Sequence, residues 1–345
     1  MRESVMQRLQ EAANTIDFQH ADFSFRRLRE AAARIANLTE ANAESSFAFL
    51  LRSAVQEFAN DTYKDLPVIY ENFVTMVTSK RRSEVYGGLY RPNLPNQVDA
   101  GEKFQDSSFS GFEREIVNYK YGRIEKFERE LFDDDLTGQV RSRASNMGEG
   151  FRLFEEIYVL NRLFGLARDE QGVTVSATTY ANAGGGTGAF NTTIGNRPVT
   201  FAALSRTTLE AAHVAMRNIT DPVGRKMLAV ANQLIVTPTE EFEAIRLTQS
   251  PVSAYNADTE SGMVNPLQGR YTVHSTNFVP AGAWVIGDFK RGFVFQRRDP
   301  LEVTQENPQS GLGFIQEVYA FRARERFEAD WIEPRFAYQG NDGTV

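Results

Sequence analysis

The chain has 345 residues, of which 41% are hydrophobic and 24% are charged, and it contains no cysteine. This balance is typical of a folded, water-soluble protein, and the missing cysteines exclude disulfides, iron–sulfur clusters, zinc–thiolate sites and thiol nucleophiles. A net charge of −7 and only three histidines, far apart in the sequence, argue against a sequence-specific reader of duplex DNA and against a histidine-rich metal site. No apolar run approaches the roughly 20 residues that a membrane-spanning helix needs, and no apolar signal region opens the chain. We therefore expect a soluble protein of cytoplasmic origin with no membrane partner.

The first 60 residues keep a helical spacing of apolar side chains without any proline or glycine. This pattern predicts two or three amphipathic helices. Two interpretations are open for them. They could form a layer that packs within the chain, or an arm that docks on a neighbouring subunit.

Residues 83–128 contain two aromatic, strand-like runs on either side of a long polar segment, which predicts an extended hairpin. An isolated two-stranded ribbon is only marginally stable in water, so the hairpin needs a partner surface from its own chain or from another subunit. The apolar and aromatic candidates for that contact are Val85, Tyr86, Tyr90, Val117, Tyr119 and Tyr121. The basic run Lys80, Arg81 and Arg82 is either solvated or available for a salt bridge to a partner.

Apolar residues then recur at intervals of four and three from Val140 to Tyr158, which predicts one long helix over about 137–165. Asp133, Asp134 and Asp135 precede it. Their negative charge favours a helix N-terminus, and we prefer this interpretation over a cation site or an acid–base pair. The uncharged segment 171–196 is rich in glycine but lacks the Gly-Lys-Ser/Thr ending of a phosphate loop, so we expect a surface loop there.

The remaining residues predict a mixed α+β body. A helical pattern over 205–231 is broken at Asp221-Pro222, and a second helix follows Pro238 with Thr237 or Thr239 as its N-cap. Strands are expected at 234–236, 271–273, 284–286, 293–295 and 318–327. On the last strand Arg322, Arg324 and Arg326 alternate, either as a solvated face or as ion-pair partners of an acidic neighbour.

This order of parts resembles the major capsid protein of tailed bacteriophages, the Hong Kong 97-type fold, and in the hairpin and long-helix region it is most similar to the Mu-like branch. Four stretches carry the resemblance: FEREIVNYKYGRIEKFERELFDDD at 112–135, NQLIVTPTEEFEAIRL at 232–247, VNPLQGRYTVHSTNF at 264–278 followed by WVIGD, and GFIQEVYAFRARERFEADW at 313–331.

The resemblance implies a domain map and a structural role. The map has a helical arm at 1–65, an extended-loop hairpin with its flanks at 66–132, a peripheral domain with a spine helix at 133–170 and 311–340, and an axial domain at 171–310. The implied role is self-assembly, as hexamers and pentamers, into the icosahedral shell of a virion that encloses double-stranded DNA without sequence-specific contacts. Assembly would take place in the cytoplasm of a bacterial host, with scaffolding, portal and decoration proteins as candidate partners.

Two other classes of function stay open on the sequence. An encapsulin-like nanocompartment would use the same fold to hold cargo enzyme. An oligomeric binding module or an enzyme is the weaker alternative, because the chain has no HExxH, no GxSxG and no complete phosphate loop. We therefore assign no catalytic, cofactor-binding or metal-binding residues, and we expect the hairpin and the helical arm to supply most of the energy of subunit contact.

Overall fold

The structure is a computed structural model that describes residues 43–89, 94–95, 97–104, 106, 111–133, 138–165, 189–251, 264–306 and 318–343. Expected features at 1–42, at Tyr90, at Asp134 and Asp135, and in the glycine-rich segment up to residue 188 lie outside these residues. The chain divides into two compact units. The first comprises residues up to Val68, Tyr119–Glu155 and Arg298–Phe327, and the second comprises Ile69–Asn118, Glu156–Arg297 and Glu328 onward.

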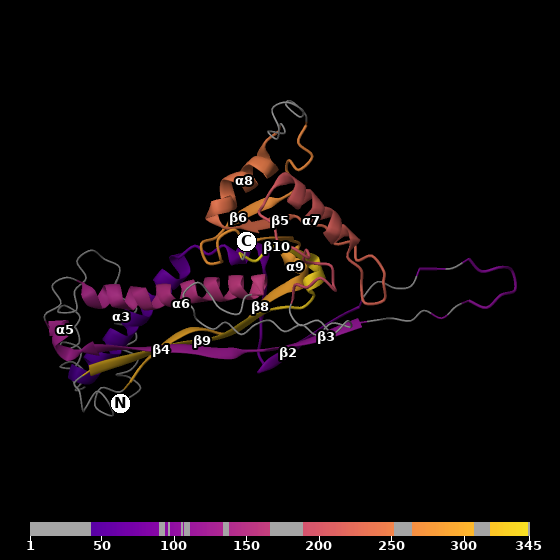
Figure 1. The fold of residues 1–345 in the computed structure, drawn as a ribbon. Helices are drawn as coiled ribbons and strands as arrows, with labels where there is room; N and C mark the ends of the chain where they lie inside the picture. The colour runs from indigo at the N-terminus through magenta and orange to yellow at the C-terminus, as the bar shows by residue number, and fades with distance from the viewer. Residues whose placement is uncertain are drawn as a thin grey trace. The chain divides into compact units, whose positions relative to one another are not determined.

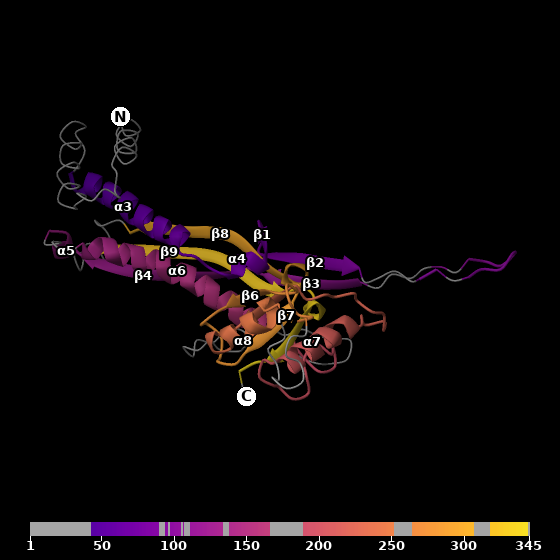
Figure 2. The same ribbon diagram turned by 90° about the horizontal axis from the view of Figure 1, so that it is seen from above.

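The first unit is built from two helices packed on strands. Its elements are α3 (Ala43–Asp65), β4 (Tyr119–Glu128), α5 (Arg129–Asp133), the first part of α6 (Gln139–Phe164), and parts of β8 (Phe293–Gln305) and β9 (Val318–Trp331). The apolar seam expected over 137–165 is therefore the helix α6. Figures 1 and 2 show α3 and α6 lying close together along β4 and β9.

The core of this unit explains why α3 belongs to it. The α3 side chains Leu50, Leu51, Ala54, Val55 and Phe58 are almost completely buried in one cluster with Val140, Ala144 and Met147 of α6 and with Phe127 and Phe321 of the strands. For residues 43–65, the packing-layer interpretation of the helical pattern is confirmed. The expectation that this stretch is a free arm was wrong, because its apolar face is already covered by its own chain.

Strand β9 is the late strand that the sequence predicts, and its pairing is long-range. It pairs antiparallel with β4 from Tyr119 opposite Phe327 to Glu128 opposite Val318. The sheet order is β1-β8-β9-β4, so β4 is an edge strand. The alternation of apolar and charged residues on β9 buries Phe321, Ala323 and Phe327 on one face, as a half-buried strand requires.

The second unit contains a four-stranded sheet with the order β10-β7-β5-β6 and the separate two-stranded hairpin β2–β3. Its remaining elements surround these strands. Their bounds are α4 (Tyr70–Phe73), β1 (Thr75–Thr78), β2 (Ser83–Leu89), β3 (Gly111–Val117), α7 (Arg206–Asn218), β5 (Gln233–Val236), α8 (Pro238–Gln249), β6 (Thr272–Ser275), β7 (Trp284–Gly287), α9 (Phe289–Gly292), the 3₁₀ turn η1 (Pro334–Phe336) and β10 (Ala337–Asn341). The expected strands near 234, 272, 284, 293 and 318 are all present.

Local sequence signals account for the helix starts in this unit. Ser205 caps α7 in a reciprocal capping box with Thr208. Pro238 is placed at the start of α8, where its missing N–H costs nothing. Thr237 occupies the N-cap position as expected, but its hydroxyl contacts Thr239 Oγ1 at 2.8 Å and accepts from the backbone of Gly282 rather than from the helix.

Two local expectations were wrong. The helical pattern over 205–231 continues only to Asn218, because the chain then turns through a Thr220–Lys226 bridge and Leu228 adopts a left-handed φ of 54°. The second run of the predicted hairpin is divided at the buried Asn118. Only Gly111–Val117 pairs with β2, whereas Tyr119–Glu128 pairs with β9.

Candidate subunit interaction surfaces

The β2–β3 hairpin is attached at its root by a buried polar network. Gln296 on β8 is completely buried, and its Nε2 donates to the carbonyl oxygen of Ile116 at 3.0 Å and to Asn118 Oδ1 at 2.9 Å. Asn118 Nδ2 in turn donates to Ser79 Oγ at 2.8 Å. Buried polar groups with complete partners fix a single geometry, so this network sets how the hairpin leaves the second unit.

Tyr86, an expected contact residue, takes part in this network. Its hydroxyl donates to Gln296 Oε1 at 2.9 Å, and burial raises its pKa, with a smaller contribution from Glu84. Tyr86 is therefore an anchor of the hairpin within its own unit. The neighbouring Val85 is 57% exposed and Val117 is half-buried, so the hairpin keeps apolar surface that is open to a partner.

The basic run Lys80, Arg81 and Arg82 is exposed. The carboxylate of Glu84 accepts hydrogen bonds from the backbone N–H groups of Lys80 and Arg81 and from the hydroxyl of Ser79. The Ser79 bond is the largest cause that lowers the pKa of Glu84. The local turn therefore holds the backbone of the run while its side chains face solvent.

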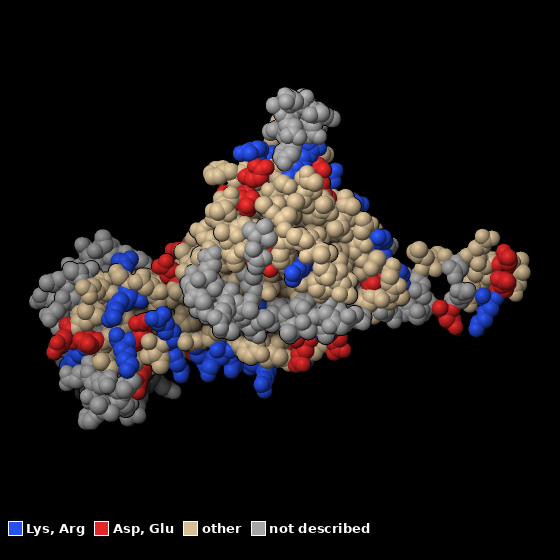
Figure 3. All heavy atoms as spheres, in the orientation of Figure 1, with Lys and Arg blue, Asp and Glu red and all other residues tan. Residues whose placement is uncertain are grey.

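The three arginines of β9 lie on one face of the sheet together with Lys120 and Ile124 of β4. Arg324 pairs with Glu302 at 2.6 Å and Arg326 lies 3.7 Å from Asp299, whereas Arg322 has no ion pair within the described part of the chain. Exposed pairs of this kind contribute about 0–1 kcal/mol each. Figure 3 shows Lys and Arg side chains gathered along β4, so this face remains basic despite the two pairs.

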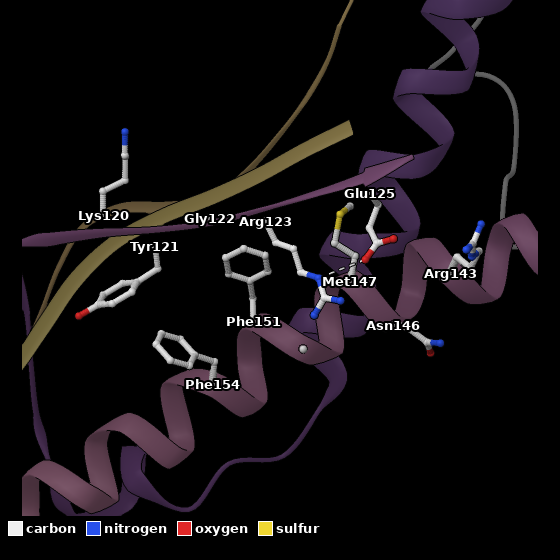
Figure 4. Close-up of a pocket in the computed structure, with 11 residues that line it drawn as sticks. Lys120, Tyr121, Gly122, Arg123, Glu125, Arg143, Asn146, Met147, Phe151 and Phe154 are labelled. Atoms are coloured by element: carbon white, nitrogen blue, oxygen red, sulfur yellow. Dashed lines mark ion pairs between the residues drawn. The ribbon is translucent and has the colours of Figure 1, made fainter. Parts of the chain in front are cut away.

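Tyr119 and Tyr121 belong to β4 and not to the hairpin. Tyr119 is 54% exposed, whereas the Tyr121 ring contacts the rings of Phe327 and Phe154 at centroid distances of 4.7 and 5.0 Å. Tyr121 thereby helps to line a groove of about 720 Å³ between β4 and α6. In Figure 4 the rings of Tyr121, Phe151 and Phe154 lie in the space between this strand and this helix.

A buried ionic cluster in the second unit is a feature that the sequence pattern does not reveal. Glu328 Oε1 accepts from Tyr158 at 2.7 Å and from Arg162 at 3.1 Å, and Arg114 of β3 donates to Asp330 at 2.8 Å. Burial raises the pKa of Glu328 to about 7 against the opposing effect of Arg162. The cluster gives the hairpin a second point of attachment through Arg114.

Among the described residues, no group of three or more histidine or acidic side chains is placed to hold a metal ion, and no helix has the length and hydropathy needed to span a membrane.

Comparison with known proteins decides the family. The family model described as phage capsid protein matches residues 113–340, which is about two thirds of the chain. The chain belongs to the phage capsid protein family. Nothing among the curated proteins matches it.

Solved structures show that this capsid protein has the Hong Kong 97-type fold expected from the sequence. The capsid of a native GTA particle aligns with a TM-score of 0.51 at 14% identity, covering 78% of this chain and 88% of that one. A chain of Microbacterium phage Oxtober96 aligns with a TM-score of 0.50 at 12% identity, covering 78% and 86%. A chain of Mycobacterium phage Che8 aligns with a TM-score of 0.50 at 12% identity, covering 81% and 93%. The assignment to a Mu-like branch stays a prediction.

The family match makes this capsid protein a structural subunit of a phage shell and favours that role over an encapsulin-like compartment. The sequence pattern placed the expected contact residues on three different surfaces. Val85 and Val117 lie on the hairpin, Tyr119 and Tyr121 on β4, and the arginines on β9. The buried Gln296 was missed, although a glutamine that ends the apolar run Phe293-Val294-Phe295 is an available signal.

Proposed function

We propose that copies of this capsid protein overlap through the β2–β3 hairpin and close into an icosahedral shell of hexamers and pentamers that holds double-stranded DNA. The observation that carries the proposal is a hairpin fixed firmly at its root but with apolar groups exposed along it and beyond it. Gln296 and Asn118 hold the root, while Val85 and, in the connecting segment, Leu94 and Phe104 are 57%, 75% and 78% exposed. A rigidly mounted ribbon with uncovered apolar side chains is suited to a contact with another copy.

Assembly multiplies weak contacts. Each overlap could be modest in free energy, because a subunit in a closed lattice makes several contacts at once and each raises the effective concentration for the next. The net charge of −7 suits a container that does not grip phosphate groups strongly. We infer contacts with packaged DNA that do not depend on base sequence.

The domain map at 1–65, 66–132, 133–170 with 311–340, and 171–310 remains part of this proposal, as do assembly in the bacterial cytoplasm and the scaffolding, portal and decoration partners. So does the absence of catalysis. The resemblance supports these points, and the two compact units divide the chain along different lines.

Deleting residues 96–110 tests the proposal. We expect the truncated chain to keep the circular dichroism of the full chain but to form no closed particles in electron micrographs. The surface variant Val199→Ser is the control, because Val199 is 89% exposed and lies away from the hairpin in sequence. Intact shells from the deleted chain would contradict the role of the hairpin. Particles from producing cells that contain enzyme cargo and no DNA would instead support the encapsulin-like alternative.

A further inference from the structure

The groove between β4 and α6 has an apolar floor and a charged rim. Met147 and Phe151 of α6 form part of the floor and are 5% and 8% exposed. Lys120 of β4 and Arg143 of α6 lie toward opposite ends of the groove, and Arg123 pairs with Glu125 at 3.3 Å between them (Figure 4). With three basic groups and one acidic group, the lining carries a net charge of +2.

The strand beside this groove has a free edge. β4 is ten residues long and, within the described residues, pairs with β9 only. An exposed edge of this length presents unpaired N–H and C=O groups that can accept an additional extended segment. The groove and the edge together therefore offer both apolar contact and backbone hydrogen bonds to one extended segment.

The chain itself contains a segment of complementary chemistry beyond the hairpin. Glu102 N–H donates to the carbonyl oxygen of Asp99 at 3.0 Å in a turn that places Gly101 at a φ of 93°. The described residues 97–104 and 106 carry Asp99, Glu102 and Asp106 with one lysine, so their net charge is −2. Phe104 stands in this acidic segment with 78% of its surface exposed.

We propose that the groove of one copy receives the segment 97–106 of a second copy. Phe104 enters the floor beside Phe151 and Phe154, and the carboxylates lie against the basic rim. The proposal rests on the proposed function and adds the site and its occupant. The occupant is argued from the opposite charges of the two surfaces and from the uncovered ring of Phe104. Burying that ring removes a large apolar surface from water, which contributes most to contacts of this kind.

Because the chain has no cysteine, pairs of introduced cysteines report this contact without background. The test pair is Phe104→Cys with Gly150→Cys, since Gly150 lines the groove and a Cβ built there meets no atom within 4 Å. Phe104→Cys with Glu149→Cys is the matched control, because Glu149 is the exposed neighbour on α6 that does not line the groove. We expect oxidised particles of the test pair to give covalent multimers on non-reducing gels, and the control pair and both single variants to give at least tenfold less.

Blocking the groove tests the same contact without a crosslink. Gly150→Trp fills the groove from α6 without entering the core, so we expect a folded subunit whose yield of closed particles falls at least tenfold. Glu149→Trp should assemble like the unmodified chain. Normal assembly of Gly150→Trp overturns the proposal, and so does a disulfide formed within one chain.

Two further outcomes separate the inference from the function on which it rests. If the unmodified chain builds shells and Gly150→Trp does not, but the 104–150 disulfide fails to form, the groove has another occupant, such as residues 1–42, and the assignment of segment 97–106 is overturned. If the unmodified chain builds no shells under any condition, the proposed function fails first.

Discussion

Glu328 gives this shell subunit a titratable group in its interior. Burial raises the pKa of its carboxyl from its usual 4.5 to about 7. The folded state therefore holds a proton that the unfolded chain has released, and the stability that this group contributes is present below pH 4.5 and is lost as the pH rises through 7. We expect the free energy of unfolding of the unmodified chain to fall by about 2 kcal/mol across this window relative to Glu328→Gln. Urea denaturation at half-unit pH steps measures it, with the exposed Glu149→Gln as control. Parallel curves for the two chains would contradict the assignment.

Two glycines of α6 provide a matched test of helix packing. A Cβ on Gly148 would come far inside contact distance of the backbone of Ala59 in α3, whereas a Cβ on Gly150 meets nothing. We expect Gly148→Ala to lower the free energy of unfolding by about 1–3 kcal/mol, because α3 and α6 must separate. Gly150→Ala should raise it by about 0.5–1 kcal/mol, since alanine is the better helix former. Differential scanning calorimetry of both variants checks the signs, and equal shifts would show that α3 and α6 can move apart without cost.

Among the elements, the hairpin depends most on a single side chain. Replacing Gln296 by leucine removes the donor to Ile116 and Asn118 and the acceptor of the Tyr86 hydroxyl. Each buried group left without a partner costs about 1–3 kcal/mol. We expect amide hydrogen exchange to accelerate at least tenfold in Ser83–Leu89 and Gly111–Val117 and to remain unchanged in β5 and β7. Gln339→Leu is the control, because Gln339 is an equally buried glutamine whose amide donates to Phe164 on α6, away from the hairpin. Unchanged hairpin exchange in Gln296→Leu would mean that strand pairing alone holds β2 and β3.

The same elements show what a sequence can reveal. The long helix α6, the strand–proline–helix of β5 and α8, and the strand β9 were predicted closely, because their periodicity and capping residues are local. The division of the hairpin run at Asn118 was not predictable in this way. It depends on β4 pairing with β9, about two hundred residues away, and on a buried amide that only tertiary contacts can satisfy. The groove escaped prediction for the same reason, since β4 and α6 form it together.

Leu228 illustrates the opposite failure. Apolar residues from Met227 to Ala231 keep a helical spacing, yet the chain adopts a left-handed conformation at Leu228 that a helix cannot contain. The preceding turn explains this, since Asp221 Oδ1 accepts from the backbone N–H groups of Val223 and Arg225 and closes the chain on itself. A side chain that competes for backbone donors defeats a pattern based on apolar spacing alone.

The division of labour between the start of the chain and its hairpin follows from these contacts. The sequence left open whether the first helices dock on a neighbour, but α3 completes the core of the first unit, so the hairpin is the better candidate for subunit overlap. Removing residues 1–65 would expose the α6 side chains that Leu51, Val55 and Phe58 cover. Deleting that much apolar contact costs far more than the typical 5–15 kcal/mol of total stability. We expect the Δ1–65 chain to be insoluble or to lose its cooperative thermal transition.

A shorter truncation separates folding from assembly. A Δ1–42 chain keeps every described core residue of α3, so we expect its thermal midpoint to stay within a few degrees of that of the full chain. Calorimetry and light scattering on the two truncations measure folding and particle formation independently. If Δ1–65 remained folded, the core of the first unit would not depend on α3. If Δ1–42 folded normally but built no particles, the leading residues would share the work of assembly with the hairpin, because folding and subunit contact would then have been lost separately.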